Sequence, residues 1–175
     1  MKYIQLTQGK RSIVDDDDYE RLNKYNWSYT NHGYAQRRKI IDGKSSIIHM
    51  HREIMGLTFN DGKFVDHING DRLDNRKENL RLCTRTENNH NMKIGKHNKS
   101  GFKGVFHRTV KKKYLGRDGT RKTYHHWCAK IMINRKAILL GTFPYTEEGK
   151  IQAAKAYNEA ARKYYGEFAY INDIE

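Results

Sequence analysis

The sequence predicts an α+β protein made of two small folded parts, and three observations support this. Short runs rich in β-branched and aromatic residues alternate with polar turns along residues 1–50. Residues 93–101 are rich in Gly, Lys and Asn, as expected of an exposed linker. Three further β-rich runs and one long helical pattern follow it. We therefore expect a first domain at 1–92 and a second at 102–175.

The first fifty residues have the pattern of a small α+β segment that precedes the rest of the first domain, and we call this segment the lead-in. The runs with strand composition are residues 3–6, 12–14, 27–29 and 46–48. The stretch YERLNKY has the spacing of an amphipathic helix. The four aspartates at 15–18 lack the alternating ligands of a calcium loop, so capping of that helix explains them better.

The pattern of the second domain predicts three antiparallel strands, over 104–108, 126–133 and 137–143, followed by a helix. Thr146 is the expected N-cap of this helix, and Gly166 is the expected stop. An alanine-rich helix face can pack on the sheet. On the middle strand, Trp127, Ala129, Ile131 and Ile133 would meet the helix, which leaves the opposite face of Cys128, Lys130 and Met132 free.

The charge of the chain indicates a polyanionic partner. Thirty-four Lys and Arg residues against 20 Asp and Glu give a net charge of +14. Residues 93–136 carry 14 basic side chains and one acidic one, Asp118. Such a stretch would neutralise phosphates, so double-stranded DNA is the expected partner. Charge alone leaves RNA open as an alternative.

Cysteine content and hydropathy give expectations about location. The two cysteines, Cys83 and Cys128, lack the spacing of a disulfide framework or a cysteine zinc site. The first residues lack the apolar core of a signal peptide, and no stretch reaches the ~20 apolar residues of a membrane span. We expect a cytoplasmic, soluble protein with no membrane association and no obligate protein partner, as a monomer or weak dimer.

The segment 64–71 and the residues after it have the spacing of a chemical site. Residues 64–68 read as a short strand that ends at a Gly turn, so Asp66 and His67 point to opposite faces and differ in role. A carboxylate and a nearby amide oxygen suit Mg²⁺ or Mn²⁺. A neutral histidine beside the ion can take a proton from water. Phosphodiester hydrolysis is therefore chemically feasible.

A helix should begin after this segment. Thr84 and Glu87 have the spacing of a capping box, in which each side chain satisfies a free backbone amide. Asn88 and Asn91 then lie on one face of that helix.

Several separated motifs, in this order, resemble the phage-type HNH homing endonucleases: Met50-His51-Arg52, Val65-Asp66-His67, Gly70-Asp71, Asp74-Asn75-Arg76, Asn79-Leu80-Arg81 and Thr84 to Asn88. The resemblance implies a ββα-metal (His-Me finger) fold over about residues 49–92. It implies that Asp66 and Asn88 bind one divalent ion, that His67 is the general base, and that Asn79 holds the loop that orients His67. Asn88 stands where many members have His, which favours Mg²⁺ or Mn²⁺ over Zn²⁺.

The second domain resembles the AP2 DNA-binding domain over residues 101–172, through Phe102 to Val105, Trp127 to Ile131, Leu140 to Phe143 and Ala153 to Ala161. By position, the DNA-contacting residues would be Lys103, Phe106, Arg108, Lys130 and Met132. Several are not the arginines and tryptophans of that family. Together with the long insert KKKYLGRDGTRKTYHH, this leaves the target sequence open.

His49 and His51 are expected to alternate along a strand and to face one side. They could form a second metal pair, but packing beside the active site is the preferred interpretation. Cys83 is expected to be a small core residue.

The resulting hypothesis is a metal-dependent DNA endonuclease of the homing type, of phage or similar origin, with a C-terminal DNA-binding module. A non-catalytic DNA-binding transcriptional regulator is the alternative.

Overall fold

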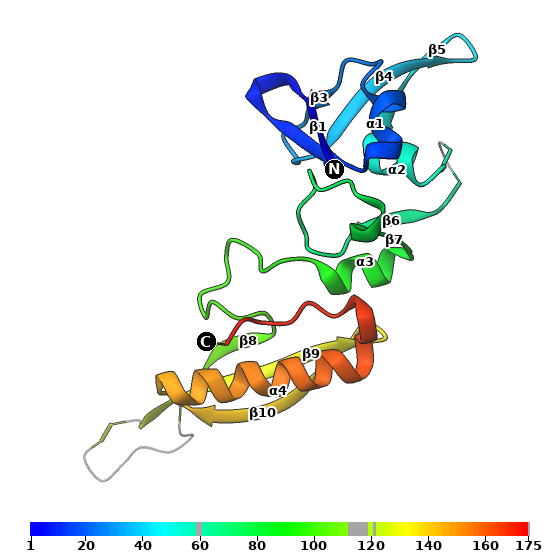
Figure 1. The fold of residues 1–175 in the computed structure, drawn as a ribbon. Helices are drawn as coiled ribbons and strands as arrows, with labels where there is room; N and C mark the ends of the chain where they lie inside the picture. Colours follow the sequence, from blue (N-terminus) through cyan, green and yellow to red (C-terminus); the bar gives the residue numbers. More distant parts are fainter. Residues whose placement is uncertain (59–60, 112–118, 121, 175) are drawn as a thin grey trace. The chain divides into compact units, whose positions relative to one another are not determined.

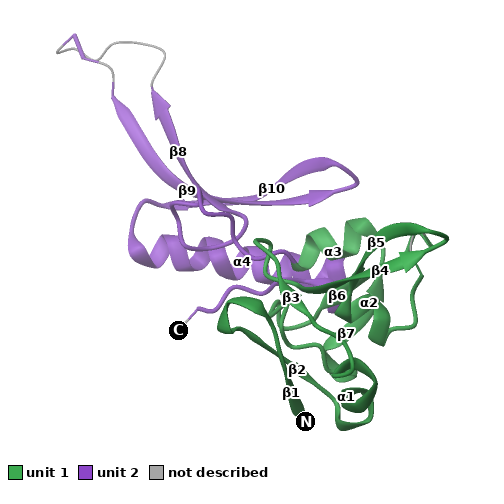
Figure 2. Cartoon of the chain, turned by 90° about the horizontal axis from the view of Figure 1, so that it is seen from above, with its two compact units in different colours: residues 1–91 green, residues 92–175 purple. Residues whose placement is uncertain are grey.

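The computed structural model divides into two compact units, Met1–Asn91 and Met92–Glu175, coloured separately in Figure 2. It describes the chain except for residues 59–60, 112–118, 121 and 175. Small antiparallel sheets combine with helices in both units, so the chain belongs to the expected α+β class. The described helices are too short or too polar to cross a membrane.

The described residues of the first unit form three antiparallel sheets and three α-helices (Figure 1). The sheets are β1–β2, β3–β4–β5 and β6–β7, with strands β1 (Lys2–Gln5), β2 (Arg11–Val14), β3 (Ser28–Tyr29), β4 (Ala35–Ile41), β5 (Lys44–His49), β6 (Phe64–His67) and β7 (Leu80–Cys83). The helices are α1 (Asp16–Leu22), α2 (Met50–Ile54) and α3 (Arg85–Asn91), with 3-10 turns at Thr7–Gly9 and Lys77–Asn79.

One apolar core joins these sheets. Its buried members are Ile4, Leu6, Val14, Leu22, Trp27, Ala35, Met50, Ile54, Val65 and Leu80. Val65 and Leu80 come from β6 and β7, while most of the others come from the first fifty residues. Strand β6, which carries Asp66 and His67, therefore packs against the lead-in through Val65.

Two local expectations for this unit were wrong. The helix expected over YERLNKY begins earlier, at Asp16, because aspartates in the first turn interact favourably with the helix dipole. As expected of the acidic run, Asp15 is the N-cap residue of α1, but its side chain bonds outside the helix: its Oδ2 accepts a hydrogen bond from Lys77 N at 2.8 Å. The strand expected to include His51 ends at His49, and α2 begins at the next residue.

The second unit has the predicted sheet and helix. Strands β8 (Val105–Lys111), β9 (Thr123–Ile133) and β10 (Lys136–Pro144) form an antiparallel sheet in the order β10–β9–β8. Helix α4 (Glu147–Tyr165) lies along this sheet (Figure 1) and is followed by a 3-10 turn, Gly166–Phe168. The insert between the first two strands lies partly outside the described residues; its ends extend β8 and β9.

The predicted cap and packing face of α4 are both confirmed. Thr146 Oγ1 accepts a hydrogen bond from Gly149 N at 3.0 Å, and the helix ends at Gly166. Ala129 and Ile131 of β9 belong to clusters that include Ala153 and Ala161 of α4. Small side chains on the helix allow it to approach the sheet closely.

Gly104 is expected to be essential for this packing. It has φ +79°, and a Cβ there would overlap the ring of buried Tyr157. Gly104→Ala should lower the free energy of unfolding by about 1–3 kcal/mol, measured by denaturant unfolding. Gly101→Ala is the matched control, because Gly101 has φ +80° and open space around its Cβ position. Equal losses in the two variants would mean that backbone strain, not the Tyr157 contact, sets the effect.

Candidate active site

Asp66 and His67 lie side by side on β6, opposite Arg81 and Leu80 of β7. Both side chains are buried, at 5% and 4% exposure. Arg81 donates to Asp66 Oδ2 from Nε at 3.0 Å and from Nη2 at 2.7 Å. This paired geometry offsets the cost of burying the carboxylate.

Helix α3 begins with the predicted capping box. Thr84 N donates to Glu87 Oε2 at 2.7 Å, and Glu87 N donates to Thr84 Oγ1 at 3.2 Å. The box fixes the start of the helix, and therefore where its asparagines meet β6.

Asn91, which the sequence did not single out as a site residue, makes the direct contact from α3 to β6. Its Nδ2 lies 3.1 and 3.0 Å from the two carboxylate oxygens of Asp66. The same nitrogen donates to the carbonyl oxygens of His67 at 3.0 Å and Ile68 at 3.3 Å. Carbonyl oxygens only accept, so the nitrogen end of this amide must face β6. Asn91 therefore holds the helix in place.

Asn88 lies three residues earlier on the same helix, half-buried. Within the described part of the chain, its side chain makes no hydrogen bond, while its backbone N donates to Thr84 O. Its amide oxygen is consequently free to accept a ligand.

Asn79 closes the loop between β6 and β7. Its Oδ1 accepts from Asn69 N at 3.0 Å, and its Nδ2 donates to Asp74 O at 2.8 Å. Its own carbonyl accepts from Ile68 N at 2.9 Å. This side chain therefore ties together both arms of the loop that follows His67.

The sequence did not predict a second set of contacts, those of Asp74, that stabilises this loop. Asp74 is buried and accepts from Arg76 Nε at 2.8 Å and Nη2 at 2.7 Å, and from Asn69 Nδ2 at 2.9 Å. The Arg76 guanidinium keeps the pKa of Asp74 below its usual value. This charged pair stabilises the loop that follows His67.

The surroundings of His67 favour its neutral imidazole form. Burial lowers its pKa below the ordinary value of 6.5, although the contact with Asn75 and the nearby charge of Asp66 act in the opposite direction. A neutral ring can accept a proton, which suits a general base.

The rings of Tyr34 and His51 pack against His67, and His49 packs against both of them. The His51 ring centroid lies 5.1 Å from that of His67, and the Tyr34 centroid lies 6.1 Å from it. His49 stacks on His51 at 5.4 Å. Burial, followed by the nearby His67, lowers the pKa of His51 to about 2. The two histidines thus pack beside the site, as preferred from sequence, although a strand–helix junction brings them there.

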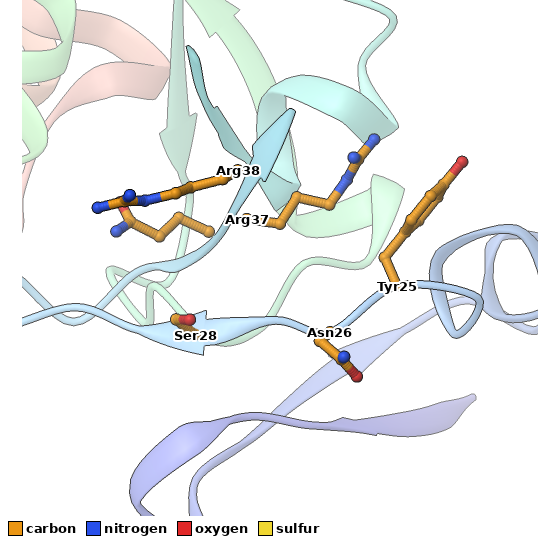
Figure 3. Close-up of a pocket in the computed structure, with 6 residues that line it drawn as sticks. Tyr25, Asn26, Ser28, Arg37 and Arg38 are labelled. Carbon is orange, nitrogen blue, oxygen red and sulfur yellow. The ribbon is translucent and has the colours of Figure 1, made fainter. Parts of the chain in front are cut away.

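Two cavities share Gln36 of β4, and one of them is lined by Tyr34 and His49. One, of about 520 Å³, is lined by Tyr29, Thr30, Asn31, His32, Tyr34, Gln36 and His49. The other, of about 510 Å³ (Figure 3), is lined by Tyr25, Asn26, Ser28, Gln36, Arg37 and Arg38. Figure 3 shows Arg37 and Arg38 extending in different directions from β4. Arg37 is paired with Glu53 at 2.9 Å, whereas Arg38 is exposed.

In the second unit, four of the five residues predicted to contact DNA share the sheet face opposite α4: Phe106, Arg108, Lys130 and Met132. Arg108 and Lys130 are exposed, and the Lys130 ammonium lies 4.9 Å from the Phe106 ring centroid. Cys128 on this face is 0% exposed, so the expectation that it would be free is wrong.

Lys103, the fifth, precedes β8 and is held within its own unit. Its Nζ donates to Met92 O at 2.6 Å and lies 5.2 Å from the Tyr170 ring centroid. Burial lowers the pKa of Lys103 to about 8.

A β-hairpin with a buried Asp–His pair, closed by a short helix that presents asparagines, has the arrangement of a nuclease site. Residues 58–90 match the family described as HNH endonuclease. An uncharacterized HNH endonuclease of Acanthamoeba polyphaga mimivirus is 30% identical over 173 residues, which cover 96% of this chain and 78% of the viral protein. The chain belongs to the HNH endonuclease family and is a DNA endonuclease.

A second relative matches a shorter segment. Protein 3.8 of Escherichia phage T7 is 48% identical over 44 residues, which cover 25% of this chain and 36% of the phage protein. No solved structure matches the chain.

Proposed function

We propose that this protein is a metal-dependent endonuclease of the homing type, whose cutting site lies at Asp66 and His67 and whose second unit positions it on duplex DNA. The observation that carries the proposal is the pairing of a buried carboxylate and a neutral imidazole on β6, next to the asparagines of α3. The carboxylate can bind a cation while the imidazole moves a proton, and the two face different sides of one strand.

His67 would act as the general base, taking a proton from the water that attacks the scissile phosphate. Asn79 would hold the loop after it through the bonds to Asn69 and Asp74. The hydrogen bonds from Arg81 Nε and Nη2 both go to Oδ2 of Asp66, so they do not occupy Oδ1 of this carboxylate.

The oxygen ligands of this site fit one hard divalent cation, Mg²⁺ or Mn²⁺. Asp66 and Asn88 would hold it, because Asp66 supplies a carboxylate and the Asn88 amide has no hydrogen bond within the described residues. Asn91 is excluded as an oxygen ligand in its present orientation, because its nitrogen faces the strand. When bound, the ion would stabilise negative charge on the phosphate and on the departing oxygen.

Replacing Asn88 and Asn91 separately tests these roles. Asn88→Ala should weaken Mn²⁺ binding, measured by calorimetry, by at least about tenfold, with little change in the unfolding free energy. Asn91→Ala should lower the unfolding free energy by about 1–3 kcal/mol, because the buried Asp66 carboxylate and the part-buried His67 carbonyl lose a donor. Unchanged Mn²⁺ affinity in Asn88→Ala, with affinity lost in a fully stable Asn91→Ala, would reverse the assignment.

The second unit would bind DNA as an AP2-like module. Arg108 and Lys130 on the face opposite α4 would meet phosphates or base edges, with Phe106 and Met132 between them. Lys103 would have a structural part, because its ammonium already bonds to Met92 O.

A further inference from the structure

A chain of buried hydrogen bonds runs from His67 into the lead-in. His67 Nε2 lies 3.2 Å from Asn75 Oδ1, and Asn75 Nδ2 donates to Ser12 Oγ at 2.7 Å. The Ser12 hydroxyl donates to the Leu73 carbonyl at 2.9 Å. Ser12 and Asn75 are 0% and 1% exposed, so their polar groups must be satisfied inside the protein.

The donor and acceptor inventory fixes the direction of this chain. The Leu73 carbonyl only accepts, so the single Ser12 proton points to it. Ser12 Oγ must then accept from Asn75, which requires the nitrogen of that amide to face Ser12. The carbonyl oxygen of Asn75 therefore faces His67, and His67 Nε2 must carry the hydrogen.

The opposite direction is unfavourable. It would leave the Ser12 hydroxyl oxygen and the Leu73 carbonyl oxygen 2.9 Å apart with no hydrogen between them. It would also turn Asn75 Oδ1 toward the Arg72 carbonyl, which now faces Nδ2 at 3.5 Å.

The backbone holds this arrangement together. Ile13 N donates to Leu73 O at 2.9 Å, and Asn75 N donates to Ile13 O at 2.8 Å. Strand β2 is thus tied to the loop on both sides of the side-chain contacts. Ser12 lies 63 residues before Asn75 in the sequence, so no local motif links them.

We propose that Ser12 and Asn75 are positioning residues that hold His67 in the Nε2–H tautomer, so that Nδ1 keeps the lone pair that accepts the proton of water. The use of Nδ1 rests on the proposed function; the tautomer itself rests only on the hydrogen bonds. The lead-in thereby supplies part of the site.

The tautomer can be measured without any cleavage assay. In ¹⁵N-labelled full-length protein at about pH 8, where histidine is neutral, the protonated and bare ring nitrogens give well-separated ¹⁵N signals. The His67 ring is assigned by its absence in His67→Gln. The wild-type ring is expected to show hydrogen on Nε2, and a ring with hydrogen on Nδ1 would overturn the proposal.

Two variants test the cause. Ser12→Ala removes the group that orients Asn75, and Asn75→Ala removes the acceptor; both should raise the Nδ1–H fraction of His67. Ser12→Thr, which keeps the hydroxyl, should restore the wild-type ring signals. Ser100→Ala is the matched control, because Ser100 is a buried serine of the second unit whose hydroxyl donates to Val105 O at 2.9 Å. An unchanged His67 ring in both alanine variants would overturn the proposal.

Cleavage gives a separate readout. Ser12→Ala should lower kcat about 10- to 100-fold with KM little changed, and Ser12→Thr should recover it. A wild-type chain with the Nε2–H tautomer that cuts no DNA would overturn the proposed function, and with it the use of Nδ1, but not the positioning.

Discussion

Replacing His67 with alanine is expected to lower the rate of DNA cleavage by about 10²- to 10⁴-fold while DNA binding is retained. In the proposed mechanism the imidazole accepts the proton, and burial lowers its pKa below the ordinary value, which favours the neutral ring. The basic face of the second unit is unaffected by the change. Time courses on supercoiled plasmid, with gel shifts on the same samples, measure both quantities.

His97→Ala is the control for this variant, since His97 is an exposed histidine outside the site. It should cut DNA as the wild type does. Because His67 is buried, the melting temperature of each variant is compared with the assay temperature, so that only folded protein is scored. A folded His67→Ala protein that cuts DNA within about twofold of the wild-type rate would remove His67 from the chemistry.

Replacing both Arg108 and Lys130 with alanine is expected to weaken duplex binding and to change its salt dependence. Each lost phosphate contact should make the slope of log K against log salt shallower by about one, so the double variant should lose about two. Fluorescence anisotropy across a salt series measures this. The double variant Lys155→Ala/Arg162→Ala removes the same charge from exposed positions on α4 and should keep the wild-type slope.

Two outcomes would contradict this assignment. Equal losses in the two double variants would mean that only the total charge matters. Preference for structured RNA over duplex DNA in a competition experiment would favour the RNA-binding alternative.

Local patterns in the sequence predicted the elements whose stability is local. The N-cap of α4 at Thr146 and the capping box at Thr84 and Glu87 were found at the expected atoms. The alternation on β9 gave the face that packs on α4, because strand side chains alternate strictly.

Other features depend on contacts between distant segments, which local patterns do not report. Strand β4 was missed because the polar and charged residues Gln36 to Lys39 hide its pattern, while Arg37 is buried through its pair with Glu53. Helix α2, which has only five residues, was mistaken for strand. The contacts of Asn91 with Asp66 and of Asn75 with Ser12 join residues far apart in sequence.

The roles of the site residues came from the resemblance to a family, and they remain proposals. What the structure adds is a physical reason to separate two asparagines on one helix face. Asn91 is committed to the carbonyls of His67 and Ile68, while the side chain of Asn88 makes no hydrogen bond within the described residues.

Cleavage of supercoiled plasmid against added metal tests the central claim most directly, with wild-type protein and Asp66→Asn in Mg²⁺, Mn²⁺ or EDTA. The wild type should nick or linearise the plasmid with either ion and lose activity in EDTA, and Asp66→Asn should be inactive in all three. Cleavage by the wild type that persists in EDTA, or metal-dependent cleavage that survives in Asp66→Asn, would contradict a metal-dependent centre at Asp66. Tight binding of a cognate site without any cleavage would instead favour a DNA-binding regulator.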